Sequence, residues 1–178
     1  MSNQFLVQYI AAANAANANG QYASAVDWCQ RAIGLSPKLP EAWYNLGRAY
    51  RGLGQLDQAM TALKKTDGLT RDNPDAQNSV GLQLLELGAF REAERCLNRA
   101  QFLAPAFVYA YSNLGMLREV QGRFDEAEAA FRKAIQLQPD LAALYVNLSG
   151  LQNLRKRHEL AEVAARRAID LDPGSCKA

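Results

Sequence analysis

One seven-residue motif recurs along this chain at a constant spacing of 34 residues. Leu-Gly-Gln-Leu-Asp-Gln-Ala at 53–59 returns as Leu-Gly-Ala-Phe-Arg-Glu-Ala at 87–93 and as Gln-Gly-Arg-Phe-Asp-Glu-Ala at 121–127. Two columns keep this spacing without insertion or deletion: Gly20, Gly54, Gly88 and Gly122, and Ala25, Ala59, Ala93, Ala127 and Ala161. A fixed period of this length indicates an array of similar units, each of which buries its apolar face against its neighbours.

Each unit has the pattern of two helices joined by a glycine turn. In residues 40–73, apolar and small residues first recur at three- and four-residue spacings, which indicate one helical face: Trp43, Leu46, Gly47 and Tyr50. A second such face follows at Leu56, Ala59, Leu63, Thr66 and Leu69. Gly54 between them can end the first helix in a left-handed conformation. The small residues in the columns of Gly47 and Ala59 predict a close helix crossing.

These columns resemble the tetratricopeptide repeat, and the resemblance covers residues 6–175. It implies an all-α fold, a right-handed superhelical solenoid of antiparallel helix pairs. We expect one domain over 1–178, with five repeats at about 6–39, 40–73, 74–107, 108–141 and 142–175. The edge repeats depart from the pattern, because the first has an alanine-rich first helix and the last has Lys156 at the turn glycine and His158 at an aromatic position.

Charge and cysteine content exclude several classes of function. The formal charge of +2, from 20 basic and 18 acidic residues, predicts neither a nucleic-acid partner nor an anionic membrane surface. Cys29, Cys96 and Cys176 have no CxxC spacing, so neither a zinc site nor a disulfide framework is predicted. We expect reduced thiols, with Cys29 in the core, and a cytoplasmic protein.

The sequence predicts a non-catalytic protein without cofactor or metal. His158 is the only histidine, and no GxSxG motif accompanies it. The glycines follow the repeat and never form GxGxxG or GxxxxGK[ST]. The paired carboxylates Glu126 and Glu128 lie on a predicted second helix, where we expect solvated surface.

The resemblance implies that the first helices line a concave wall that binds an extended peptide or a partner helix. The predicted peptide-binding positions are those that turn away from the packing columns: Tyr44, Asn45, Arg48, Arg51, Asn78, Ser79, Leu82, Tyr109, Asn113, Met116, Val146 and Asn147. Arginines mark one end of this wall and apolar residues the other. We therefore expect a partner with an acidic and a hydrophobic element.

One column of this wall is rich in asparagine. Asn45, Asn113 and Asn147 share it, with Ser79 between them. An asparagine amide can donate to a peptide carbonyl and accept from the adjacent amide. The column resembles the asparagine ladder of the eukaryotic O-linked N-acetylglucosamine transferase. Packing within the array is the alternative role, since buried amides also need partners.

Three functions stay open at this point. The first is a protein–protein interaction scaffold that binds a segment of a partner in its groove. The second is the N-terminal, substrate-recruiting region of a larger enzyme, such as a glycosyl- or sulfotransferase. The third is self-assembly: Ile169 and Leu171 match the packing columns of Ile135 and Leu137, yet only seven residues follow Leu171. That edge predicts either a longer chain or a homo-oligomer.

Overall fold

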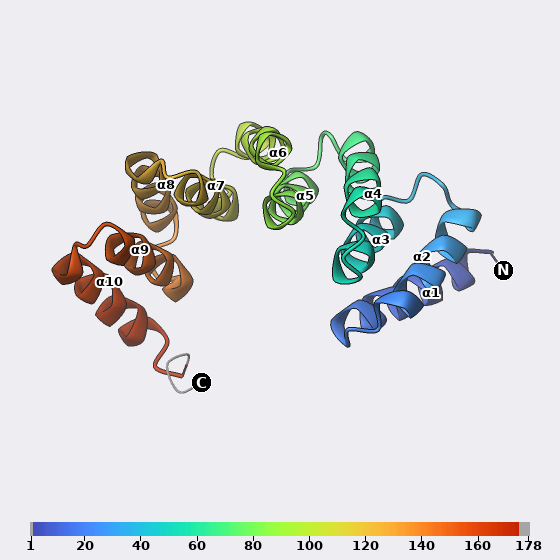
Figure 1. Cartoon of the computed structure of the whole chain (residues 1–178), viewed down its shortest axis with the longest axis horizontal. Helices are drawn as coiled ribbons and strands as arrows, with labels where there is room; N and C mark the ends of the chain where they lie inside the picture. The colour runs from blue at the N-terminus through green and yellow to red at the C-terminus, as the bar shows by residue number, and fades with distance from the viewer. Residues whose placement is uncertain (1, 175–178) are drawn as a thin grey trace. The chain divides into compact units, whose positions relative to one another are not determined.

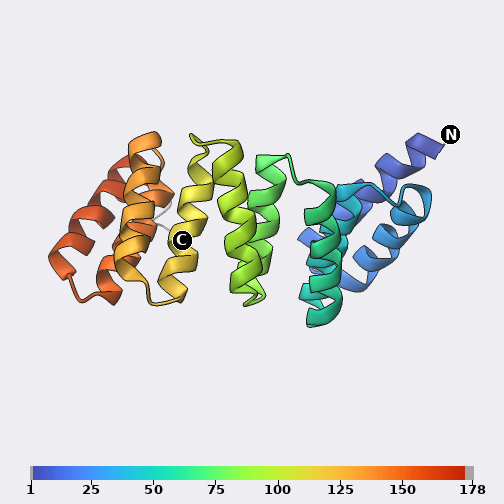
Figure 2. The same ribbon diagram turned by 90° about the horizontal axis from the view of Figure 1, so that it is seen from above.

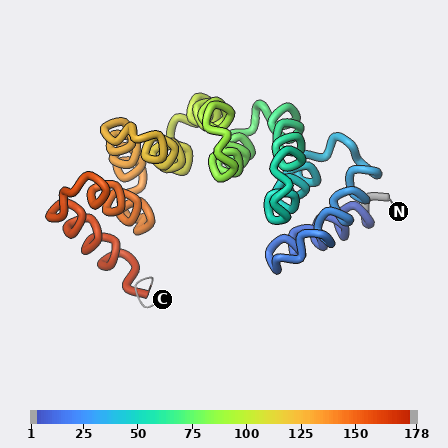
Figure 3. Tube along the Cα trace, in the orientation of Figure 1, coloured from blue at the N-terminus to red at the C-terminus, as the bar shows by residue number. Residues whose placement is uncertain are grey.

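The computed structural model describes residues 2–174, which form ten α-helices and no strand. Figures 1 and 3 show the helices joined by short connections. They are α1 (Ser2–Ala18), α2 (Tyr22–Leu35), α3 (Pro40–Gly52), α4 (Leu56–Leu69), α5 (Pro74–Glu86), α6 (Phe90–Leu103), α7 (Val108–Val120), α8 (Phe124–Leu137), α9 (Ala142–Leu154) and α10 (His158–Leu171). The predicted all-α repeat fold is confirmed, with odd-numbered helices first and even-numbered helices second in each repeat. Cys176 lies outside the described residues.

The chain divides into two compact units, Met1–Cys96 and Leu97–Ala178, and the boundary falls inside α6. Within unit 1, α1 packs along α2 and α3 along α4; within unit 2, α7 packs along α8 and α9 along α10 (Figure 2). A first helix also packs on the preceding repeat, since α3 contacts α1 and α2, and α9 contacts α7 and α8. The single domain over 1–178 stays a prediction.

The turn inside each repeat depends on one residue with positive φ. Gly20, Gly54, Gly88 and Gly122 have φ of +72°, +73°, +74° and +74°. After the second of these, the amide of Gln55 donates to the carbonyl of Tyr50 at 2.9 Å, which closes the end of α3. Lys156 keeps the same geometry at φ +58°, although a side chain there adds strain. The departure from glycine therefore leaves the fifth turn in place.

The small-residue column lets the two helices of a repeat cross closely. A Cβ atom added at Gly47 would lie 2.9 Å from Cγ of Leu63, and one added at Gly115 would overlap the ring of Phe131. In the last repeat the column holds Ser149, whose hydroxyl donates to the carbonyl of Ala161 at 2.8 Å. The prediction of a close crossing is confirmed at these positions.

The column of Cys29 lies in the core. Cys29, Leu63, Leu97 and Phe131 are all 0% exposed. Burial raises the pKa of the Cys29 thiol to about 12, so the thiol stays protonated and unreactive at neutral pH. The predicted core position of Cys29 is confirmed.

Candidate functional site

A pocket in unit 1 brings together three of the predicted peptide-binding residues, Tyr44, Asn45 and Ser79. Its volume is about 290 Å³. The lining residues come from α1, α3 and α5, from the end of α4 and from the connection that follows it: Asn14, Pro40, Glu41, Tyr44, Asn45, Thr66, Thr70, Asn73, Ala76 and Ser79. Most of these side chains carry a hydroxyl, an amide or a carboxylate. The pocket can therefore offer both donors and acceptors to a bound segment.

Helix starts position the walls of this pocket. Pro40 and Pro74 are the first residues of α3 and α5, where a missing amide proton costs nothing. The side chain of Asn73 caps α5 by accepting from the amide of Ala76 at 3.0 Å. The sequence therefore sets where both first helices begin, and with them the position of the pocket.

Asn45 is the deepest of the three predicted residues, at 3% exposed. The side-chain amide of Asn17 donates to the carbonyl of Asn45 at 3.0 Å and lies 3.5 Å from its Oδ1. These contacts join α1 to α3 inside unit 1. At this position the contacts favour a packing role for the asparagine column over a peptide-binding role.

Charged residues surround Tyr44 on the same face. The pKa of Tyr44 is raised overall. Burial is the largest cause and the charge of Glu86 adds to it, while the charges of Arg48 and Arg51 lower the pKa. Nη1 of Arg51 lies 2.5 Å from a carboxylate oxygen of Glu86, so this ion pair connects α3 to α5. The predicted arginines thus lie near Tyr44, with an acidic partner that the repeat pattern does not indicate.

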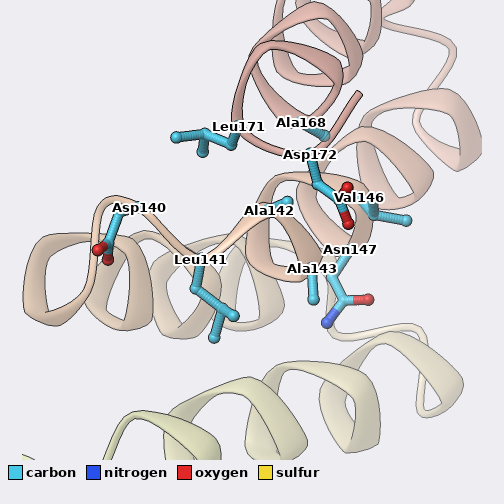
Figure 4. Close-up of a pocket in the computed structure, with 9 residues that line it drawn as sticks. All are labelled: Asp140, Leu141, Ala142, Ala143, Val146, Asn147, Ala168, Leu171 and Asp172. Carbon is cyan, nitrogen blue, oxygen red and sulfur yellow. The ribbon is translucent and has the colours of Figure 1, made fainter. Parts of the chain in front are cut away.

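A second pocket lies in unit 2, with a volume of about 580 Å³ (Figure 4). Val146 and Asn147 of the predicted set line it. The full lining is Asp140, Leu141, Ala142, Ala143, Val146, Asn147, Ala168, Leu171 and Asp172. Alanine and branched apolar side chains dominate, while two carboxylates stand in the connections beside α9 and α10. The amide nitrogen of Asn147 donates to Oγ of Ser112 at 3.1 Å, which connects α9 to α7.

The two pockets occupy the same place in repeats 2 and 5. A shift of three repeats converts six lining positions of the first pocket into lining positions of the second: Pro40 into Ala142, Glu41 into Ala143, Tyr44 into Val146, Asn45 into Asn147, Thr66 into Ala168 and Thr70 into Asp172. In unit 1 the next first helix, α5, supplies a further wall through Asn73, Ala76 and Ser79. The pocket of unit 2 has a more apolar lining.

The other predicted residues lie outside these two pockets. Asn78 and Asn113 are buried, Tyr109 is 52% exposed, and Leu82 is half-buried. Met116 packs against the core cluster of Ala127, Phe131 and Leu151. Arg48 is half-buried on α3. The predicted wall therefore mixes buried, half-buried and exposed residues, and Tyr109 is its most exposed apolar residue in the fourth repeat.

The expectation of solvated surface is wrong for Glu128. Its carboxylate is buried and lies 2.7 Å from Nη1 of Arg155, 3.2 Å from Nη1 of Arg157 and 2.6 Å from Nη2 of Arg132. Two of these arginines belong to the turn of the next repeat, so the ion pairs connect α8 to the fifth hairpin. Glu126 is exposed, as expected.

Asp67 is a second buried acid that the sequence interpretation missed. Nη2 of Arg95 donates to its Oδ2 at 2.6 Å, and Nε2 of Gln77 donates to its Oδ1 at 3.2 Å. Burial raises the pKa of Asp67, but the hydrogen bonds from Arg95 and Gln77 and the charge of Arg95 outweigh burial and lower the pKa overall. Asp67 thereby joins α4 to α5 and α6 within unit 1.

The lowered pKa of Asp67 predicts an acid-dependent contribution to stability. The contribution is complete above the unfolded-state pKa of about 3.9 and disappears as the pH falls through the folded-state value. We expect Asp67→Asn to lower the free energy of unfolding by about 1–3 kcal/mol at neutral pH, because Arg95 and Gln77 lose a charged acceptor. Urea denaturation of both proteins at several pH values measures this. A difference that stayed constant below about pH 4 would contradict the assignment.

Within residues 2–174, no group of three or more His, Cys, Asp or Glu side chains could hold a metal ion. His158 is exposed at the start of α10, beside Arg157 and Glu159. No helix in the same part of the chain is both long and apolar enough to cross a bilayer.

Family models for the tetratricopeptide repeat match residues 16–81 and 108–141, together more than half of the chain. A search of curated proteins found no significant match. Among solved structures, MamA 41-end from Desulfovibrio magneticus RS-1 is 21% identical over 98% of each chain, with a TM-score of 0.74. PilF from Pseudomonas aeruginosa is 20% identical over 96% of this chain and 76% of its own, with a TM-score of 0.77. YrrB is 24% identical over 93% of this chain and 86% of its own, with a TM-score of 0.64. These structures share the fold, and the chain belongs to the tetratricopeptide repeat family.

Proposed function

We propose that this chain is a non-catalytic protein-interaction module that binds a peptide or helical segment of another protein against its first helices. The observation that carries this proposal is the unit 1 pocket, in which side chains from α1, α3 and α5 meet at positions that the repeat pattern predicts for binding. Membership of the repeat family supports a role in binding proteins. So does the likeness to YrrB, described as a TPR protein with an unusual peptide-binding site.

The chemistry of the unit 1 pocket suits a peptide backbone. An extended peptide presents alternating amide donors and carbonyl acceptors. Ser79 lines the pocket with a hydroxyl that can serve either role. The hydroxyls of Thr66 and Thr70 donate to the carbonyls of Ala62 and Thr66, so they offer a bound peptide acceptor oxygens. Tyr44 adds a large, partly buried ring with a polar end, the kind of residue that dominates binding energy at interfaces.

Apolar surface on the first helices of unit 2 supports a hydrophobic element in the partner. Tyr109 on α7 is 52% exposed, and Val146 on α9 is 56% exposed. Large apolar side chains this accessible commonly mark interaction sites when they gather on one face. In the described part of the fourth repeat, the second helix α8 has no exposed large apolar side chain. In the fourth repeat, α7 therefore offers a more apolar docking surface than α8.

Peptides selected from a random phage-displayed library on the immobilised chain provide a defined ligand. We expect Tyr44→Ala to weaken binding of a selected peptide by roughly 1–3 kcal/mol, because truncating a buried aromatic anchor removes contact area at the pocket. Lys65→Ala is the matched control, since Lys65 is exposed on the second helix α4 of the same repeat. Fluorescence anisotropy measures the affinities, and circular dichroism checks that helicity is unchanged.

The affinities of the two variants distinguish binding at the first helices from binding elsewhere on the surface. Loss of affinity in Tyr44→Ala alone supports binding at the unit 1 pocket. Equal affinity in the wild type and Tyr44→Ala, or a loss confined to Lys65→Ala, would place the peptide elsewhere and count against the proposal.

A further inference from the structure

We infer that a pocket between α3 and α4, here called the aromatic pocket, binds the side chain of an arginine that a partner protein presents. Its volume is about 310 Å³. The lining residues are Trp43, Leu46 and Tyr50 from α3 and Asp57, Gln58, Thr61 and Ala62 from α4. None of them lines the unit 1 pocket described above. The aromatic pocket is therefore a separate site in the same unit.

Two aromatic side chains line this pocket from α3. Trp43 and Tyr50 lie about two helical turns apart and are both half-buried. Nε1 of Trp43 donates to the carbonyl of Pro37 at 2.8 Å, which fixes the indole ring. A guanidinium is attracted to the face of an aromatic ring. Unit 1 already contains one such contact, because the guanidinium of Arg31 lies 4.7 Å from the centre of the Trp28 ring.

The α4 side of the pocket offers hydrogen-bond acceptors. Among the residues that the structure describes, no cation forms an ion pair with the exposed carboxylate of Asp57. The hydroxyl of Thr61 donates to the backbone carbonyl of Asp57 at 2.9 Å, so its oxygen is left as an acceptor. Gln58 adds an amide oxygen. A guanidinium has several N–H donors and no acceptor, so it matches this side of the pocket.

These features favour arginine over lysine as the bound side chain. The planar guanidinium can stack on an aromatic ring and form two parallel hydrogen bonds to a carboxylate such as that of Asp57, whereas an ammonium group can do neither. Leu46 and Ala62 supply apolar surface at the base of the pocket. The methylene stem of an arginine can pack against such a surface while its charged end meets the acceptors.

The fourth repeat supplies an arginine of its own at the equivalent place. A shift of two repeats converts Trp43 into Tyr111, Leu46 into Leu114, Tyr50 into Arg118, Asp57 into Asp125 and Gln58 into Glu126. The side chain of Arg118 is 13% exposed, and its Nε lies 3.5 Å from a carboxylate oxygen of Glu126. In unit 2 an arginine side chain therefore connects α7 to α8 at the position of Tyr50 in unit 1.

The carboxylate equivalent to Asp57 also binds an arginine in unit 2. Asp125 lies 2.6 Å from Nη2 of Arg155, which belongs to the turn of the next repeat. Two repeats earlier, the position of Arg155 holds Leu87. Unit 1 thus keeps the acidic residue but has Tyr50 and Leu87 where unit 2 has arginines. This charge pattern favours an arginine from a partner at Asp57.

Titration with short peptides tests the inference. The probe is acetyl-Gly-Arg-Gly-amide, and its citrulline analogue has nearly the same shape without the charge. The indole N–H signal of Trp43 in heteronuclear NMR reports binding, and Trp28→Phe identifies that signal because the chain has two tryptophans. We expect a saturable shift with the arginine peptide and about tenfold weaker binding of the citrulline peptide, since the charge-assisted hydrogen bonds are lost. The lysine analogue should also bind more weakly.

Asp57→Asn removes the charge at the pocket with little change in shape. We expect it to weaken binding of the arginine peptide about tenfold. Asp27→Asn is the matched control, because Asp27 is exposed on α2, carries the same charge and does not line the pocket. This control should bind the arginine peptide like the wild type. Circular dichroism and thermal melting check that both variants fold.

Equal binding of the arginine and citrulline peptides would overturn the inference, and so would a lysine peptide that binds as tightly as the arginine peptide. An Asp57→Asn variant that binds like the wild type would overturn it as well. An equal loss of affinity in Asp27→Asn would show attraction by the overall charge and not by this pocket. Binding of a library-selected peptide at the unit 1 pocket is a separate measurement, since no residue lines both pockets.

Discussion

Replacing Glu128 with alanine is expected to lower the free energy of unfolding by roughly 3 kcal/mol, because it removes the buried partner of Arg155 and leaves that guanidinium with only the exposed carboxylate of Asp125. The side chain of Arg155 is 14% exposed and that of Glu128 is 9% exposed, so water screens this pair little. Glu128 also accepts from Arg157 in the turn of the last repeat. The loss should therefore loosen the fifth hairpin. Urea denaturation followed by circular dichroism measures the change.

Glu126→Ala is the matched control for this substitution. Glu126 lies two residues earlier on α8 and is exposed, with Arg123 as its partner in the same repeat. Its removal should have a much smaller effect, since exposed ion pairs contribute little. If the two substitutions lowered stability equally, the Glu128 network would contribute no more than a surface pair. Arg155 would then be adequately held by Asp125, whose carboxylate lies 2.6 Å from its Nη2.

Gly115→Ala is expected to destabilise the chain by about 1–3 kcal/mol, the usual cost of overpacking a core. Alanine is the better helix former by roughly 0.5–1 kcal/mol. A net loss of stability would therefore have to come from the lack of room for the added methyl group. The added methyl group would overlap the ring of Phe131, which is fully buried and has little room to move. The crossing of α7 and α8 would have to open.

Gly150→Ala provides the opposite expectation in the next repeat. No atom lies within 4 Å of a Cβ placed at Gly150, and the residue is exposed on α9. Stability should therefore rise by about 0.5–1 kcal/mol from helix propensity. Thermal denaturation of both variants tests the pair. An increase in stability for Gly115→Ala as well would show that the small-residue column is not a steric requirement.

The repeated part of the structure could be predicted from the sequence because its determinants are local and periodic. Gly54 needs positive φ whatever its neighbours are, and Gly115 meets a large second-helix residue within its own repeat. The ion pairs could not be predicted in the same way. Asp67 with Arg95 and Glu128 with Arg155 connect different repeats, and in each pair at least one residue, Asp67, Arg95 or Arg155, does not recur at its column.

The candidate site was only partly predictable for a related reason. The period assigns Tyr44, Asn45 and Ser79 to first-helix positions, and the structure places them around one pocket. The repeat period does not indicate that Thr66, near the end of α4, and Thr70, just after it, complete that pocket. It also gives no measure of how deeply Asn45 is buried, because burial depends on how Asn17 packs against it.

Photo-crosslinking tests most directly whether the first helices bind the partner segment. A benzophenone amino acid replaces Tyr44 in one protein and the exposed Lys65 on α4 in another, and each is irradiated with a library-selected peptide. Binding at the first helices predicts a covalent adduct from position 44 and none from position 65. An adduct from position 65 with none from position 44 would contradict it.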